Sequence, residues 1–178
     1  MTVQVNKGLE SKQSFVIPSL LQVLMSIRQV FEQSIEIRAA ATLVERCIVD
    51  RTLMHKWLNP LLRCDPEGEW DTAVGSRSLF IIKIPVLQPT LESVVLERQP
   101  GLIVWGFDGF FKGCDRWECQ PQIQGTLLIN RFEFQIPNRL IRFGFNQFAA
   151  PWTQKDMKDQ LRRLKRVAEQ LSQKMGNA

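Results

Sequence analysis

Residues 116–134, RWECQPQIQGTLLINRFEF, predict two β-strands that face each other across a turn at Gln122–Gly125. Side chains of a strand alternate between its two faces, so this hairpin has one polar and one apolar face. The polar face carries Arg116, Glu118, Arg131 and Glu133, and the apolar face carries Trp117, Cys119, Leu128, Phe132 and Phe134. The apolar face must lie against a packed core or against a pocket. A packed core would make the sheet purely structural, whereas a pocket would make it part of a binding site.

Further alternating segments lie upstream of the hairpin and are joined mostly by short turns, which predicts an antiparallel sheet. Between the first and second of these segments, residues 39–58 change to a helical period and predict two short helices, with Asp50 as the cap of the second. A turn-rich connection, with room for a short strand, follows at Cys64–Ser76. The alternating segments are Phe31–Arg38, Arg77–Ile84, Thr90–Arg98 and Leu102–Phe107.

The C-terminal segment is the most clearly helical part of the chain. Thr153 and Asp156 resemble a capping box, and Pro151–Trp152 are expected to end the segment before it. Arg139–Ala150 fits either a strand or irregular structure, and Pro18–Arg28 predicts a short helix near the N-terminus. The apolar positions of the long helix, spaced by three and four residues, are Met157, Leu161, Leu164, Ala168, Leu171 and Met175.

The composition is that of one folded domain, because 178 residues with 44% hydrophobic and 23% charged residues can bury a substantial core. The net charge of +5 comes mainly from residues 153–178, which hold seven basic and three acidic residues. A solvated helix face explains this excess better than nucleic-acid binding. A weaker alternative is contact with an anionic membrane surface. The basic residues considered for it are Lys158, Arg162, Arg163, Lys165 and Arg166.

The cysteines predict no metal site, because their spacing is irregular and contains no CxxC pair. Buried free thiols in a reducing compartment are the expectation, and no cofactor is indicated. The apolar stretch Phe15–Ile27 has 13 residues and contains Pro18, so it is too short to span a bilayer and lacks a cleavage site. A cytoplasmic location is therefore expected. The four cysteines are Cys47, Cys64, Cys114 and Cys119.

The order of these elements resembles the SRPBCC superfamily, which includes START domains, polyketide cyclases and the birch-pollen allergen class. In particular it is similar to uncharacterised bacterial members labelled cyclase/dehydrase. The residues that carry the resemblance are FEQSIEIRAAA (31–41), Asp50, Trp57, Gly75–Ser76, the hairpin 116–134 and MKDQLRRLKRVAEQL (157–171).

The resemblance implies an α+β helix-grip fold. In this fold a curved antiparallel sheet wraps a long C-terminal helix, two short helices follow the first strand, and an elongated cavity remains between sheet and helix. Residues 30–178 would form this domain, and residues 1–29 would be an N-terminal extension.

The inward-facing residues follow from the alternation once charged residues are placed outward. They line a pocket for an apolar ligand, or they are core packed to normal density, and both interpretations remain open. The predicted set is Ile35, Ile37, Phe80, Ile82, Trp105, Phe107, Trp117, Phe132 and Phe134 from the strands, with Leu161, Leu164 and Ala168 from the helix.

Asp115 joins this ligand-binding set because its position gives it the same face, together with Gln33, Ser78 and Asn130. A carboxyl group that faced an apolar cavity would have a raised pKa and could act as a general acid or base. The neighbouring Gly113–Cys114 instead favour a solvated turn residue. His55 is expected on the surface, and no Ser-His-Asp, HExxH, P-loop or GxGxxG arrangement is present.

Three functions fit these observations. The first is a non-enzymatic protein that binds or transports a hydrophobic molecule, such as a lipid, an isoprenoid or an aromatic polyketide. The second is a cyclase or dehydratase that acts on a hydrophobic substrate in the same cavity. The third is an assembly protein whose cavity is filled by its own side chains and whose residues 1–29 bind a partner.

Overall fold

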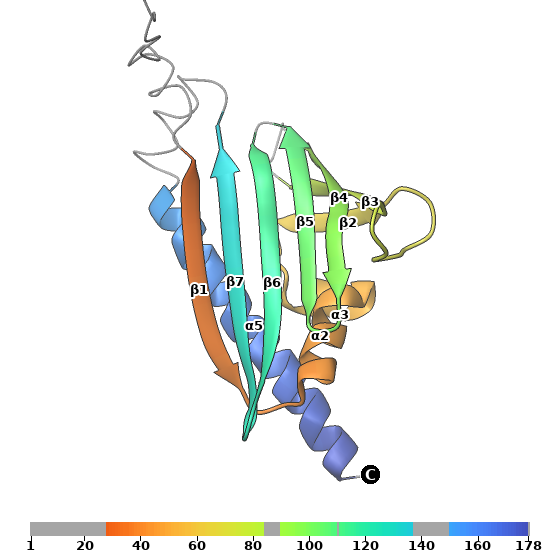
Figure 1. Cartoon of the computed structure of the whole chain (residues 1–178), viewed down its shortest axis with the longest axis vertical. Coiled ribbons are helices and arrows are strands. Elements are labelled where there is room, and N and C mark those ends of the chain that lie inside the picture. Colours follow the sequence, from red (N-terminus) through yellow and green to blue (C-terminus); the bar gives the residue numbers. More distant parts are fainter. Residues whose placement is uncertain (1–27, 84–89, 110, 137–149, 178) are drawn as a thin grey trace, which may run out of the picture.

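The computed structural model describes residues 28–83, 90–109, 111–136 and 150–177. Within these residues one antiparallel sheet of seven strands runs in the order β1-β7-β6-β5-β4-β3-β2 (Figure 1). Each predicted alternating segment is a strand, and the short strand expected after the helices is β2. The strands are β1 Gln29–Ile37, β2 Leu62–Pro66, β3 Arg77–Ile82, β4 Thr90–Gln99, β5 Leu102–Gly109, β6 Lys112–Gln122 and β7 Gly125–Gln135.

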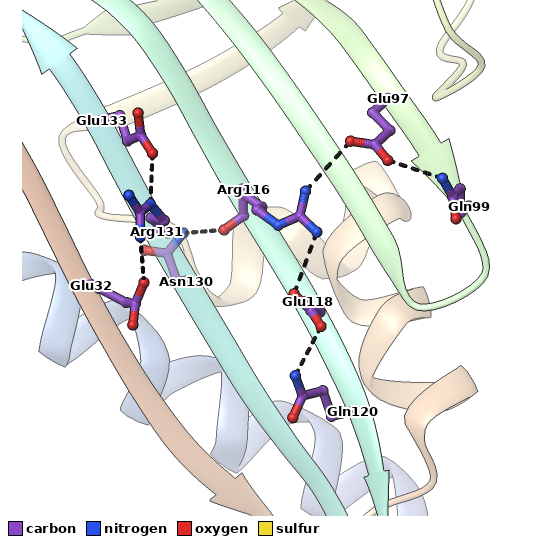
Figure 2. A network of polar contacts seen from close by, with 9 residues as sticks. All are labelled: Glu32, Glu97, Gln99, Arg116, Glu118, Gln120, Asn130, Arg131 and Glu133. Carbon is purple, nitrogen blue, oxygen red and sulfur yellow. Dashed lines mark hydrogen bonds and ion pairs between the residues drawn. The ribbon is translucent and has the colours of Figure 1, made fainter.

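The hairpin of β6 and β7 has the predicted turn and the predicted faces. Gln122 pairs with Gly125, so two residues form the loop, and Gly125 has a φ of 132°, which favours glycine. On the polar face, Arg116 contacts Glu97 at 3.4 Å and Arg131 contacts Glu133 at 2.6 Å. Figure 2 shows this charged network spread over the strands, so this face of the sheet meets water.

The two short helices are α2 (Ala41–Val49) and α3 (Arg51–Trp57), as predicted. Asp50 caps α3, because its carboxylate accepts a hydrogen bond of 3.0 Å from the backbone N–H of Leu53. The indole N–H of Trp57 donates to the carbonyl of Cys47 at 2.8 Å and ties the helices together. The pair packs on the sheet through contacts of α2 with β6 and β7 and of α3 with β2.

The long helix α5 (Ala150–Gly176) lies behind β1, β7 and β6 in Figure 1 and runs past the lower edge of the sheet. It packs on β1, α2 and α3, which confirms the helix-grip arrangement. Two predictions at its ends were wrong. The helix already includes Pro151, which the first turn tolerates, so Thr153 lies inside the helix and does not cap it. Met175 is exposed, because its turn extends beyond the sheet.

The four cysteines are free thiols, and Cys47, Cys64 and Cys119 are buried, as expected, whereas Cys114 is only half-buried. Burial raises the pKa of Cys64 to about 11 and that of Cys119 to about 12, so these thiols are protonated at neutral pH. The structure of Arg139–Ala150 and the predicted helix at Pro18–Arg28 fall almost entirely outside the described residues.

Candidate functional site

The inner face of the sheet is the face that the helices cover, and the strand register defines it. Phe31 pairs with Phe132, Phe132 with Asp115, and Asp115 with Trp105, so these four side chains share one face. The next row contains Gln33, Asn130, Trp117 and Ile103. By the same register, every strand residue of the predicted ligand-binding set lies on this inner face.

The predicted set divides into two groups by burial. The residues near the helices belong to the main packed core, and Phe134 is buried in a second, smaller apolar cluster. Others face inward and yet keep part of their surface accessible, which distinguishes them from ordinary core. The buried group is Ile37, Trp105, Trp117, Phe134, Leu161, Leu164 and Ala168, and the half-buried group is Ile35, Phe80, Ile82, Phe107, Asp115 and Phe132.

Aromatic rings gather at the end of the inner face where β6 begins. Phe107 and Phe132 stack with their centroids 5.1 Å apart although β6 runs between their strands. Gly113 pairs with Phe107 and has no side chain, so the two rings can meet above it. Phe134 extends the cluster, with centroids 4.9 Å from Phe132 and 5.4 Å from Phe31. The cluster forms an apolar surface separate from the main core.

Asp115 lies between this aromatic cluster and the tryptophans of the core. One carboxylate oxygen accepts from the indole N–H of Trp117 at 2.7 Å, and the other accepts from the amide of Asn130 at 2.6 Å. Burial raises the pKa of Asp115 to about 6, although both hydrogen bonds lower it. The interpretation as a solvated turn residue was wrong, because Gly113 and Cys114 belong to β6 and Asp115 points inward from that strand.

Two serines add polar groups to the inner face. Ser78 is buried and hydrogen-bonds the thiol of Cys64. Ser93 is 4% exposed, and its hydroxyl group has no hydrogen-bond partner among the described residues. Sequence reasoning did not single out Ser93, although its place two residues before the inward-facing Val95 could have indicated its direction.

The remaining polar candidates have structural partners elsewhere. The side-chain amide of Gln33 donates to the backbone carbonyl of Gln154 at 3.0 Å and so holds β1 against α5. His55 is exposed, as predicted, and its ring nitrogens contact the carbonyl of Arg51 and the N–H of Cys64. Neither residue reaches the group around Asp115 through these contacts.

A hollow of about 720 Å³ lies on the opposite, outer face of the sheet. Its lining includes Gly106, over which the side chain of Leu96 lies, and charged side chains of both signs. Lys112 and Asp108 in its wall pair with each other at 3.2 Å and are largely exposed. This wet, charged surface is a poor place for an apolar molecule. The charged lining residues are Arg28, Glu67, Arg77, Glu92, Asp108 and Lys112.

Residues 28–169 match the family model described as polyketide cyclase / dehydrase and lipid transport. The chain belongs to this family. It is thus a member of the SRPBCC superfamily, as the resemblance in sequence indicated. No curated protein matches it.

Solved structures share the fold at low sequence identity. Protein CV1439 from Chromobacterium violaceum has a TM-score of 0.60 and 17% identity, covering 79% of this chain and 96% of its own. TTHA0849 from Thermus thermophilus has a TM-score of 0.64 and 13% identity, covering 82% and 99%. SA2116 from Staphylococcus aureus, a protein of unknown function, has a TM-score of 0.64 and 10% identity, covering 82% and 96%.

Among the described residues, no helix is long and apolar enough to cross a membrane.

Proposed function

We propose that this protein binds or transports a hydrophobic small molecule on the inner face of its sheet, beside the aromatic cluster. The observation that carries the proposal is the half-buried state of Phe80, Phe107 and Phe132, which face inward. Large apolar side chains that keep accessible surface in the interior are suited to contact a guest. The family description, which includes lipid transport, supports the same ligand class.

An acid–base enzyme acting on a ligand at the same place is the second candidate. Asp115 favours it, because a carboxyl group with a pKa of about 6 exchanges a proton readily near neutral pH. Trp117 and Asn130 fix its orientation. In a dehydration, Asp115 would remove a proton from a carbon atom of the substrate, and the electron pair of that C–H bond would form a double bond to the neighbouring carbon as its C–O bond breaks. Asp115 would then return the proton to the departing hydroxyl group, which leaves as water.

The proposal includes a cytoplasmic location and a weak contact with anionic membrane surfaces. Lys158, Arg162 and Arg166 support this contact, because they are exposed on α5. Arg163 and Lys165, which were considered with them, instead hydrogen-bond backbone carbonyl groups of other elements. Arg163 donates to the carbonyl of Trp57, and Lys165 donates to that of Glu36, each at 2.7 Å.

The first test is native mass spectrometry of the protein purified from its own host, followed by solvent extraction of any bound molecule. A stoichiometric lipid, isoprenoid or polyketide would support the proposal and identify the ligand. Incubating that molecule with fresh protein separates the two candidates, because an enzyme of the second kind would release a product lighter by one water molecule. A ligand recovered unchanged supports binding or transport.

A matched pair of variants on β3 tests the location of the site. Phe80 faces inward and Leu79 faces outward, and both are half-buried. We expect Phe80→Ala to weaken binding of the neutral apolar dye Nile red by roughly fivefold, as lost contact area of this size implies. Leu79→Ala should leave the affinity within about twofold. Equal losses in both variants, or a loss in Leu79→Ala alone, would contradict an inner-face site.

A further inference from the structure

Next to the aromatic cluster, the charge on the inner face of the described strands is negative. The negative charge belongs to the carboxylate of Asp115. Arg98 is the one cationic side chain on the inner face of the described strands. Arg98 belongs to the other end of β4 and forms an ion pair with Glu45 of α2. A negative charge brought next to Asp115 would therefore find no cation to compensate it among the described strand residues.

Asp115 has hydrogen-bond acceptor positions that its two partners, Trp117 and Asn130, do not use. A carboxylate has about four acceptor positions, and the bonds from Trp117 and Asn130 use one on each oxygen. The two remaining positions can accept from a bound molecule, since the residue is half-buried and its neighbours Trp105 and Phe132 are apolar. An apolar guest that covered the carboxylate without donating to it would remove water and leave those positions empty, which is costly.

Ser93 provides a second, independent sign that a polar ligand atom belongs here. Its hydroxyl group is buried and has no hydrogen-bond partner among the described residues. It lies on the same inner face, two strands from Asp115, or about 10 Å across the sheet. Buried polar atoms without partners are rare in folded proteins, so this hydroxyl group is a further position for a ligand oxygen or nitrogen.

We propose that the molecule bound on the inner face has a hydrogen-bond-donating polar end, an amine or a hydroxyl group, which contacts Asp115. The site discriminates against apolar molecules with an acidic end. This inference rests on the proposed function and names the class of its ligand. An acidic end would put two negative charges side by side in a desolvated place, whereas an amine neutralises the carboxylate and a hydroxyl group donates to it.

The test compares three ligands that share one decyl chain and differ in the polar end: decylamine, decanol and decyl sulfate. Each is titrated below its micelle concentration against protein loaded with Nile red. For the wild-type protein we expect the amine and the alcohol to displace the dye at concentrations at least about tenfold lower than the sulfate. In Asp115→Asn, which removes the charge and keeps the shape, this difference should largely disappear through tighter binding of the sulfate.

The control is Asp108→Asn, the same change at an exposed carboxylate of the outer face. It should keep the wild-type order of the three ligands. If the sulfate displaces the dye as well as the alcohol does in the wild-type protein, the inference is wrong and the proposed function stands. If Nile red does not bind at all, the proposed function fails and the inference falls with it.

A measurement on the wild-type protein replaces the variant if Asp115→Asn does not fold. The amine and the sulfate keep their own charges between about pH 5 and about pH 8, so a change in their relative affinity reports on the protein. The sulfate should approach the alcohol as pH falls through the pKa of Asp115, at about 6. The thiols of Cys64 and Cys119 stay protonated in this range. The charged side chains of the elements packed on this face form ion pairs with each other, Arg98 with Glu45 and, on α5, Arg163 with Asp156. A constant ratio would overturn the inference.

Discussion

The hydroxyl group of Ser93 is buried on β4, and no described residue hydrogen-bonds it. A buried polar group without a partner costs about 1–3 kcal/mol, since water satisfied it in the unfolded chain. The ligand-free fold carries this cost, and a ligand atom at the same position would remove it. A locally reduced stability of this kind is typical of binding sites.

We therefore expect Ser93→Ala to make the ligand-free protein more stable. The gain should be about 1 kcal/mol, or a rise of about 2–4 °C in Tm for a domain of this size. Thermal unfolding followed by circular dichroism measures it. Ser34→Ala, at an exposed position of β1, serves as the control and should leave Tm unchanged. A lower Tm for Ser93→Ala would show that the hydroxyl group is satisfied in the folded protein.

Gly113 explains why the sequence misplaced its neighbour Asp115. Glycine next to a charged residue predicts a turn, and the alternation alone could not correct this. In the structure Gly113 lies within β6. The residue is a glycine because a side chain there would collide with the backbone of Glu133 and Phe134. Glycine allows the two strands to approach closely at this point. That approach depends on the partner strand, so the local sequence does not indicate it.

At the scale of elements, α5 is held by hydrogen bonds as well as by its apolar stripe. Arg163 donates from Nε to the carbonyl of Trp57, the last residue of α3, at 2.7 Å. This places a cation at the C-terminal end of a helix, where the helix dipole favours positive charge. The same guanidinium contacts Asp156 of α5 at 3.4 Å. The arrangement fixes α5 against the short helices.

Arg163→Gln should accordingly destabilise the protein by about 1–2 kcal/mol, since it removes a charged donor from a half-buried carbonyl. Arg166→Gln changes an exposed residue of the same helix and should stay within about 0.5 kcal/mol of wild type. Urea denaturation of both variants measures the difference. Equal stabilities would mean that apolar packing alone holds α5 in place.

The elements themselves were predictable where one periodic signal ran without interruption. The alternation in β6 and β7, with glycine at Gly125, set both strands and their turn, because the side-chain period of two survives any tertiary context. The start of α5 was not predictable in the same way. Pro151 can end one segment or open the next, and the choice depends on what precedes it in space.

For the whole molecule, the sequence could indicate which residues face inward but not which of them keep accessible surface. Phe80 and Phe134 are both inward-facing phenylalanines, yet Phe80 is half-buried and Phe134 is 1% exposed. The difference depends on the neighbours of each ring: Phe134 is buried among the other rings of the aromatic cluster, whereas Phe80 packs at the border of the main core. Distances between layers are set by the sum of all packing contacts, and no local pattern reports them.

The titration of Asp115 should be visible in the stability of the whole molecule. Its pKa is about 6 in the folded protein and near 3.8 when unfolded, so the folded state holds the proton at higher pH. Its contribution to stability is then fully present below the unfolded value and is lost as pH rises through the folded value. The unfolding free energy of wild type minus that of Asp115→Asn should fall by about 2–3 kcal/mol between about pH 4 and about pH 7.

Urea denaturation at several pH values measures this difference, and subtraction removes the titrations that both proteins share. Asp108→Asn is the control, because Lys112 and the backbone of Gly109 lower the pKa of Asp108. Its contribution to stability changes only below about pH 4, so its difference from wild type should stay nearly flat over this range. A flat difference for Asp115→Asn would place its carboxyl group in water. Decylamine at saturating concentration should flatten the slope, because an amine that pairs with the ionised carboxylate removes the advantage of protonation. Stability against pH would then report the same contact as the ligand series.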